Sequence, residues 1–189
     1  MSNQVCLVGE IGELTHDHNI YGENFYKTTL TVKRDSGNTD IIPLLVPERV
    51  LVSNVRGCVG VKGEFRSYND HSENKTKLKL YVYVTELEMV NDNTNINDVF
   101  LEGYICKLPV YRKTPLGREI CDVMLAINRD NGKSDYIPCV FWGKKACYVK
   151  GLEVADCIRV AGRIQSREYT KDGIVKTAYE LSVNLFEFS

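Results

Sequence analysis

Two stretches of the sequence, RDSGNTDIIP (residues 34–43) and RDNGKSDYIP (residues 129–138), are one ten-residue pattern that recurs 95 positions later. Six of the ten residues are identical, and each stretch follows a run of alternating apolar residues. Glycine flanked by Asn, Asp and Ser is the composition of a turn that joins two β-strands. The chain therefore carries the same hairpin twice. The copies differ afterwards, since the first continues LLVPERV and the second CVFWGKKA.

The repetition extends on both sides of this hairpin. NQVCLVGEIGEL (residues 3–14) matches NDVFLEGYICKL (97–108), and VKGEFRS (61–67) matches VAGRIQS (160–166). A period near 95 residues is too long for a solenoid repeat and has the size of a small domain. The polar segment NDNTNIND (91–98) fits a linker. We therefore expect two tandem domains, 1–92 and 96–189.

Each half has the pattern of an all-β domain. Runs such as VCLVGEI and CDVMLAINRD alternate apolar with small or polar residues, as strands do. KKACYVKG, closed by Gly151, is a candidate for a short helix. Five strands with a helix between the third and fourth are the element order of an OB-fold. The expected fold is all-β, with two tandem five-stranded OB-fold barrels, each with a short helix between strands 3 and 4. The repeated hairpin joins strands 2 and 3.

Composition limits the function classes. The chain has 189 residues, 43% of them hydrophobic, and a formal net charge of −1. Residues 1–93 carry a net charge of −3 and residues 94–189 carry +2, so the second half is the better partner for a polyanion. No apolar run is long enough for a membrane span, and the N-terminus lacks a signal-peptide pattern. Seven Cys without a CxxC pair are typical of reduced, buried thiols, and we expect a cytoplasmic, nucleoid-associated protein.

Strand alternation divides the second half into two faces. In DYIPCVFW one face carries Ile137, Cys139 and Phe141, and the other carries Tyr136, Val140 and Trp142. In DCIRVAGRIQSREY the apolar or small set is Ile158, Val160, Gly162, Ile164 and Ser166, and the opposite set is Arg159, Arg163, Arg167 and Tyr169. Two elements thus pair a core face with an outer face of aromatic rings and arginines.

Aromatic rings on a basic face suit a single-stranded nucleic acid, because bases stack on the rings and cations meet the phosphates. The alternative is cross-strand packing with solvated arginines. YRKTPLGRE could extend the basic track. The predicted nucleic-acid-binding residues are Tyr136, Trp142, Tyr169, Arg163, Arg167, Arg129, Arg112, Lys113, Arg118 and Lys144.

Four motifs in the second half, NDVFLEG, VMLAINR, VFWGKKA and GRIQSREY, occur in the order and spacing of a known family. With them, residues 97–185 resemble the bacterial single-stranded DNA-binding proteins. The resemblance implies that aromatic residues at positions 136, 142 and 169 stack on bases. It also implies an assembly of four OB-folds, which a homodimer of this chain would reach. Members end in an acidic tail that recruits replication or repair proteins. This chain stops at NLFEFS, so recruitment by a tail is not expected.

The first half keeps the scaffold pattern but not the binding residues. Ile41, Pro47 and Asp70 stand where the second half has Tyr136, Trp142 and Tyr169. The possible contacts that are left are Phe65, Arg66 and Tyr68. In KLKLYVYV one face carries Lys77, Lys79, Tyr81 and Tyr83. That face could be a second stacking platform, but an edge strand protected by lysines is the preferred interpretation.

Enzyme signatures are weak. HDH (residues 16–18) could place two imidazoles near a metal, but no further ligands accompany it, and no phosphate-binding loop or nucleophile motif occurs. We expect no enzyme activity, no cofactor and no metal. The predicted function is sequence-independent single-stranded DNA binding in replication, recombination or repair. The alternatives are a primosome-type protein-interaction accessory and a single-stranded RNA-binding module.

Overall fold

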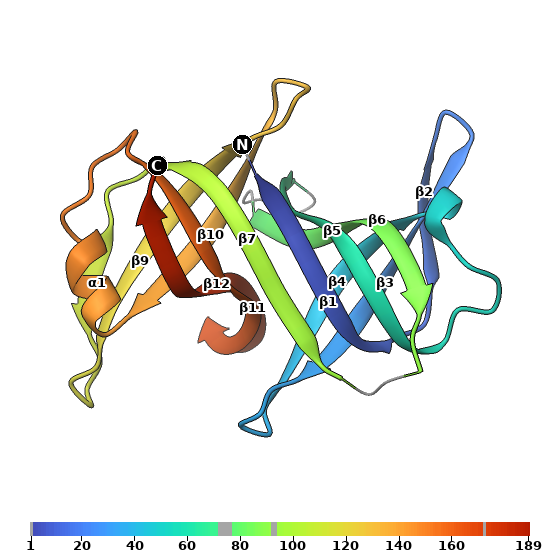
Figure 1. Cartoon of the computed structure of the whole chain (residues 1–189), viewed down its shortest axis with the longest axis horizontal. Helices are drawn as coiled ribbons and strands as arrows, with labels where there is room; N and C mark the ends of the chain where they lie inside the picture. The colour runs from blue at the N-terminus through green and yellow to red at the C-terminus, as the bar shows by residue number, and fades with distance from the viewer. Residues whose placement is uncertain (1, 72–76, 92–93, 172) are drawn as a thin grey trace. The chain divides into compact units, whose positions relative to one another are not determined.

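The computed structural model describes residues 2–71, 77–91, 94–171 and 173–189 (Figure 1). The fold separates into two compact units, one of residues 4–98 and one of residues 99–189, and the N-terminal residues up to Asn3 group with the second. The predicted linker, residues 91–98, ends at this division, although residues 92–93 lie outside the described part and β7 already begins at Ile96. The predicted domain bounds, 1–92 and 96–189, stay a prediction.

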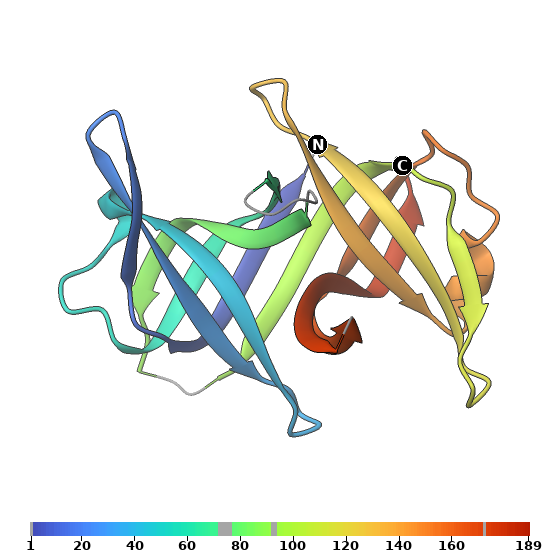
Figure 2. The same ribbon diagram turned by 180° about the vertical axis from the view of Figure 1, so that it is seen from behind.

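The two units have the same order of strands. The first contains β1 (Asn3–Ile11), β2 (Thr15–Ile20), β3 (Glu23–Lys33), β4 (Thr39–Pro47), a 3-10 turn (Glu48–Val50), β5 (Gly57–Asp70) and β6 (Lys77–Met89). The second contains β7 (Ile96–Ile105), β8 (Val110–Lys113), β9 (Glu119–Asn128), β10 (Ser134–Trp142), α1 (Lys144–Val149), β11 (Cys157–Lys171) and β12 (Ile174–Phe188). The expected all-β class is confirmed, and the repeated hairpin is β3–β4 in one unit and β9–β10 in the other (Figure 2).

Two details differ from the expectation. Within the described residues each unit has six strands, because the short strands β2 and β8 precede the repeated hairpin. The helix is α-helical only in the second unit, as α1, whereas the first unit has three residues of 3-10 helix at the same point. The connection at this point is shorter in the first unit, with residues 48–56 between β4 and β5, than in the second, with residues 143–156 between β10 and β11.

The five long strands of each unit pair in a circuit. In the first unit β1 pairs with β3 and β5, β5 with β6, β6 with β4 in parallel, and β4 with β3. In the second unit β7, β9, β10, β12 and β11 repeat these pairings. A circuit with one parallel contact between the strands numbered 3 and 5 of the five is the pairing of an OB-fold.

A β-bulge occurs at the same place in both units. The register shifts between Lys62 and Gly63 on β5, and between Ala161 and Gly162 on β11. A Cβ at Gly63 would lie 2.3 Å from the carbonyl oxygen of Tyr83, and one at Gly162 would lie 2.1 Å from that of Ser182. Only glycine lets the two backbones approach this closely, and the bulge bends the strand around the core.

The repeated hairpin is identical at its two ends because these residues form a buried ion pair. Asp40 and Asp135 are fully buried. Nε of Arg34 donates to Oδ2 of Asp40 at 2.6 Å, and Nε of Arg129 donates to Oδ2 of Asp135 at 2.6 Å. In each pair Nη2 makes a second bond to Oδ1. A bidentate arginine satisfies a carboxylate that the fold has removed from water.

The cysteines are less buried than expected. Of the seven, which form no disulfide, Cys121 and Cys139 are buried and Cys6 is exposed, while the other four are half-buried. Burial raises the pKa of the Cys121 thiol to about 11. Sequence runs such as VCLV place a cysteine among apolar residues, but alternation turns Cys6 to the solvent face. None of the described helices has the length and apolar character that crossing a membrane requires.

Candidate nucleic-acid interface

Strand β10 presents two aromatic rings on its outer face. Tyr136 is 43% exposed and Trp142 is 37% exposed. The alternate residues Ile137, Cys139 and Phe141 are buried in the core, and this confirms the alternation read from DYIPCVFW. Val140 is the exception, since it was placed with the two rings but is buried. At that point β12 pairs alongside β10 in parallel, with Val140 opposite Ser182.

Trp142 borders a hollow at the end of β10. The hollow is lined by Gly117, Arg118, Glu119, Trp142 and Gly143. It forms because Trp142 pairs with Ile120 of β9, and the β8–β9 turn folds back beside it. The Arg118 side chain is exposed there, so one predicted ring and one predicted cation face the same space. Lys144, the first residue of α1, is also exposed and follows Trp142 by two residues.

Glu119 gives this hollow a negative component that the sequence did not indicate. Its Oε1 accepts a hydrogen bond of 2.8 Å from the hydroxyl of Tyr111. This bond and local burial raise the pKa of Tyr111 to about 12. The pKa of Glu119 is lowered, first by a hydrogen bond from Cys147 and then by that from Tyr111. The carboxylate is therefore held ionised next to the tryptophan and reduces the positive charge of the hollow.

The other cations of the β8–β9 hairpin already have partners. Nε of Arg112 donates to Oδ2 of Asp122 at 3.0 Å, and Nζ of Lys113 lies 3.9 Å from Oε1 of Glu119. Both side chains are about half exposed or more, so these are solvent-screened surface pairs. A phosphate can replace either carboxylate at small cost. Arg112 and Lys113 thus stay candidate contacts. The neighbouring carboxylates, however, make this hairpin less positive than the sequence suggested.

Strand β11 carries the second part of the interface. Tyr169 is 38% exposed, and the guanidinium carbon of Arg167 lies 5.9 Å from the centre of its ring. Nη2 of Arg163 lies 3.4 Å from Oε1 of Gln165 on the same face. Arg163 is half-buried and Arg167 is exposed. The structure therefore places both predicted arginines and the tyrosine along one outer face of β11.

A buried carboxylate holds this face in place, and sequence reasoning missed it. Glu180 on β12 is buried, with Oε1 accepting from Gln165 at 2.8 Å and Oε2 accepting from Arg167 at 3.2 Å. In TAYELSV the glutamate looks like an ordinary solvent-facing residue. Only the cross-strand register, with Gln165 opposite Glu180, shows that it is covered. Arg167 is oriented by Glu180 rather than being a mobile surface cation.

Residues 96–189, which contain both faces, match the model of a family described as "Single-strand binding protein family". Residues 96–189 belong to this family. "Single-stranded DNA-binding protein 3" of Listeria innocua serovar 6a is 38% identical over 81 residues, which cover 39% of this chain and 51% of that protein. "Single-stranded DNA-binding protein 1" of Staphylococcus aureus (strain COL) is 36% identical over 81 residues, covering 39% and 48%. The chain thus spans about half the length of these curated relatives.

The fold of the whole chain also has a solved counterpart. The wild-type single-stranded DNA binding protein from Thermus aquaticus aligns with a TM-score of 0.82 and 17% sequence identity, over 100% of this chain and 93% of that one. At this identity the similarity concerns the fold alone. It supports the OB-fold assignment for both halves, including the half that the family model does not match.

Arg129 of the family-matching unit has a structural partner. Its guanidinium binds the buried Asp135, and Arg34 binds Asp40 in the same way in the first unit. The Arg129 side chain is 20% exposed. A role in DNA contact stays a prediction, but the ion pair accounts for this arginine without a ligand. The sequence contained the signal, since Arg and Asp recur at the first and seventh positions of both hairpin copies.

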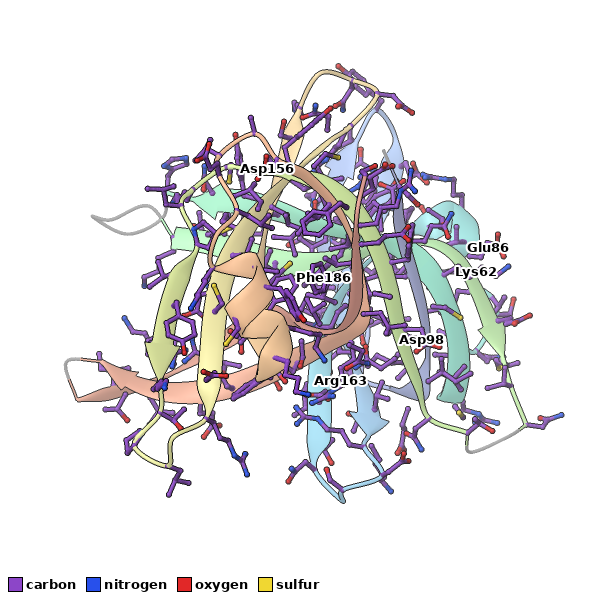
Figure 3. All side chains as sticks on the ribbon, turned by 60° about the vertical axis from the view of Figure 1, so that its left-hand side comes forward. Lys62, Glu86, Asp98, Asp156, Arg163 and Phe186 are labelled. Carbon is purple, nitrogen blue, oxygen red and sulfur yellow. The ribbon has the colours of Figure 1, made fainter. Side chains whose placement is uncertain are left out.

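The first unit has a different surface at the equivalent positions. Ile41 is 49% exposed and Pro47 is buried, so no aromatic ring takes the place of Tyr136 or Trp142. Of the contacts suggested for this unit, Phe65 is excluded because it is fully buried. Ordinary alternation along β5 places Phe65 on the same, core side as Val61, which is also buried. Lys62 makes an ion pair of 2.8 Å with Glu86 across the hairpin (Figure 3).

The histidines of HDH lie in strand β2. The ring of His18 stacks on Phe25 at 4.8 Å, and its Nδ1 lies 2.6 Å from Oδ2 of Asp17. Asp17 also pairs with Lys27. These contacts explain the residues as hairpin packing. Among the residues that the structure describes, no group of three or more His, Cys, Asp or Glu side chains could hold a metal ion.

Proposed function

We propose that this protein binds single-stranded DNA without strong sequence preference, through the outer faces of β10 and β11. The observation that carries the proposal is the set of exposed rings of Tyr136, Trp142 and Tyr169, together with arginines, in the unit that belongs to the family. Stacking on rings is tolerant of base identity, because every base has a π-face. The protein then acts as a non-catalytic coating of single strands during replication, recombination or repair, in the bacterial cytoplasm and associated with the nucleoid.

The test uses Trp142, which is the only tryptophan of the chain. Its fluorescence is measured during titration with oligo-dT, oligo-U and a DNA duplex of equal length. Strong quenching by oligo-dT with little change from the duplex supports the proposal. If oligo-U gives the same quenching at a lower concentration than oligo-dT, the protein is instead a single-stranded RNA-binding module. If no oligonucleotide quenches the fluorescence or shifts in a gel, the protein is instead the protein-interaction accessory.

Charge at β11 gives a second expected result. Arg163→Ala and Arg167→Ala should each lower affinity for oligo-dT regardless of base sequence. Each should also reduce the slope of log K against log salt by about 0.7 to 1, because each arginine releases about one counterion from a phosphate. Arg56→Ala is the matched control, since Arg56 is exposed in a loop of the first unit. An unchanged salt slope in both β11 variants would count against phosphate contacts there.

We further propose that the protein is a homodimer, which presents four OB-folds. Phe100, Ala161 and Leu185 stand in register across β7, β11 and β12, and Leu185 is 71% exposed. Such an apolar row on an outer sheet face is the kind of surface that a second copy covers. Light scattering should give the dimer mass at micromolar concentration. Leu185→Asp should shift it toward the monomer, whereas Leu116→Asp, at an exposed turn, should not.

A further inference from the structure

The last hairpins of the two units, β5–β6 and β11–β12, can be compared rung by rung. Each hairpin places four cross-strand pairs on its outer face, beyond the bulge at Gly63 or Gly162. The pairs of the first unit are Glu64–Tyr83, Arg66–Tyr81, Tyr68–Lys79 and Asp70–Lys77. Those of the second unit are Arg163–Ser182, Gln165–Glu180, Arg167–Ala178 and Tyr169–Lys176. Each residue of these pairs in β5–β6 has its counterpart 99 positions later in β11–β12, so the four rungs of the two hairpins are equivalent.

This comparison shows where the aromatic residues are. Both hairpins have a Tyr opposite a Lys, Tyr169–Lys176 in one and Tyr68–Lys79 in the other, one rung apart. Tyr68 is 44% exposed, slightly more than Tyr169. The sequence motif of the second unit does not extend to Tyr68, which aligns with Arg167. The chemistry is therefore present in the first unit at a shifted position.

The first unit adds two further rings beside Tyr68. The rings of Tyr68 and Tyr81 meet edge to face, with centroids 5.7 Å apart and an angle of 61°. The guanidinium of Arg66 lies 3.8 Å above the ring of Tyr83. These three tyrosines alternate along β5 and β6 with buried Phe65 and Val82. Together they form a continuous aromatic strip on the solvent side of the hairpin.

Hydrogen bonds hold Tyr83 and Arg66 of the strip in place. Nη2 of Arg49 donates to the hydroxyl of Tyr83 at 2.7 Å, while its Nη1 donates to Glu23 at 2.6 Å. Nε of Arg66 donates to Glu64 at 2.8 Å. Rings and guanidinium planes that are fixed before binding lose little conformational entropy when a base stacks on them. An edge strand protected only by lysines needs neither the rings nor this bracing.

From these contacts we infer that the strip of Tyr68, Tyr81 and Tyr83, with Arg66 and Lys79, is a second binding surface for single-stranded nucleic acid. Bases stack on the exposed ring of Tyr68 and on the outer edge of Tyr81. Lys79, opposite Tyr68, meets a phosphate. The inference rests on the proposed function and extends it, because the first unit then binds the ligand rather than serving only as scaffold.

The balance of forces differs from that in the second unit. Glu64 and Asp70 lie on the same face as the tyrosines and reduce its positive charge. Stacking rather than phosphate contact therefore dominates here. Removal of Tyr68 should weaken binding at low and high salt by a similar factor, unlike the arginine variants of β11.

The decisive experiment moves the fluorescent reporter. Trp142→Phe combined with Tyr68→Trp leaves one tryptophan, on the strip. Titration with an oligo-dT long enough to span both units should quench it, whereas the matched chain with Trp142→Phe and Tyr21→Trp should show little change. Tyr21 is fully exposed at the β2–β3 turn of the same unit. Binding of both chains is monitored in parallel by anisotropy of a labelled oligonucleotide.

Affinity provides the second arm. Tyr68→Ala should weaken binding of the long oligo-dT about 5-fold or more, the lower end expected for loss of one stacked base. Tyr21→Ala should leave it unchanged. If the reporter at position 68 is silent while labelled oligo-dT still binds, the strip is only cross-strand packing and the inference fails alone. If wild-type Trp142 is also silent and no oligonucleotide binds, the proposed function fails as well.

Discussion

Replacing Arg129 by alanine is expected to lower the free energy of unfolding of the second unit by about 3 to 5 kcal/mol. The substitution leaves the fully buried carboxylate of Asp135 without its bidentate partner, and a carboxylate away from water is costly unless it is paired. Urea unfolding followed by the fluorescence of Trp142 measures the effect. Since the chain has no other tryptophan, this signal reports on the second unit alone.

Two controls separate this stability role from DNA contact. Arg118→Ala removes an exposed arginine of the same unit and should leave the unfolding midpoint unchanged. Arg34→Ala breaks the equivalent pair of the first unit and should leave the Trp142 signal in place if the units unfold separately. An Arg129→Ala protein with unaltered midpoint but lost affinity for oligo-dT would instead show that Arg129 is a ligand contact.

Trp142→Ala should weaken binding of single-stranded DNA by about 1–3 kcal/mol, or roughly 5- to 150-fold, with little loss of stability. The ring is 37% exposed at the end of β10, so its removal creates no internal cavity. Anisotropy of a labelled oligo-dT measures the affinity, and thermal melts by circular dichroism measure the fold. The two readings are needed together because the variant removes the intrinsic fluorophore.

Its neighbour supplies the contrast. Phe141 is fully buried and packs edge to face against Phe186 at 5.6 Å. Phe141→Ala should therefore destabilise the second unit by about 3–5 kcal/mol. If Trp142→Ala melts as early as Phe141→Ala, the tryptophan acts as a core residue and the interface has to be sought elsewhere.

The fold could be predicted from the sequence because the repeat shows the long strands twice. Alternation identified the long strands, and the faces of β10 and β11 followed from it. The short strands β2 and β8 were missed because THDHNI and VYRK bury almost nothing, so no apolar alternation marks them. They form because they pair with β3 and β9. The alternation of residues along one strand does not reveal such a pairing.

The candidate site was predicted less completely, and the reason is register. Exposure of Tyr136, Trp142 and Tyr169 depends on alternation alone and was anticipated. Burial of Glu180 and of Asp135 depends on which residue stands across the strand or around the turn. Charged partners also decide whether a cation is available to a ligand, so Arg112, Arg129 and Arg167 looked more similar in sequence than they are in the structure.

The bulges at Gly63 and Gly162 bear on how a duplicated gene can diverge. At each of them a methyl group would collide with a backbone carbonyl oxygen, which no repacking of side chains can move. Mutation can therefore change the solvent-facing residues of the hairpin beyond the bulge, for example tyrosine to arginine or glutamate. The glycine bulge that sets the strand register stays fixed. Two copies that both keep the bulge can evolve different ligand-binding surfaces while the backbone that carries those surfaces stays the same.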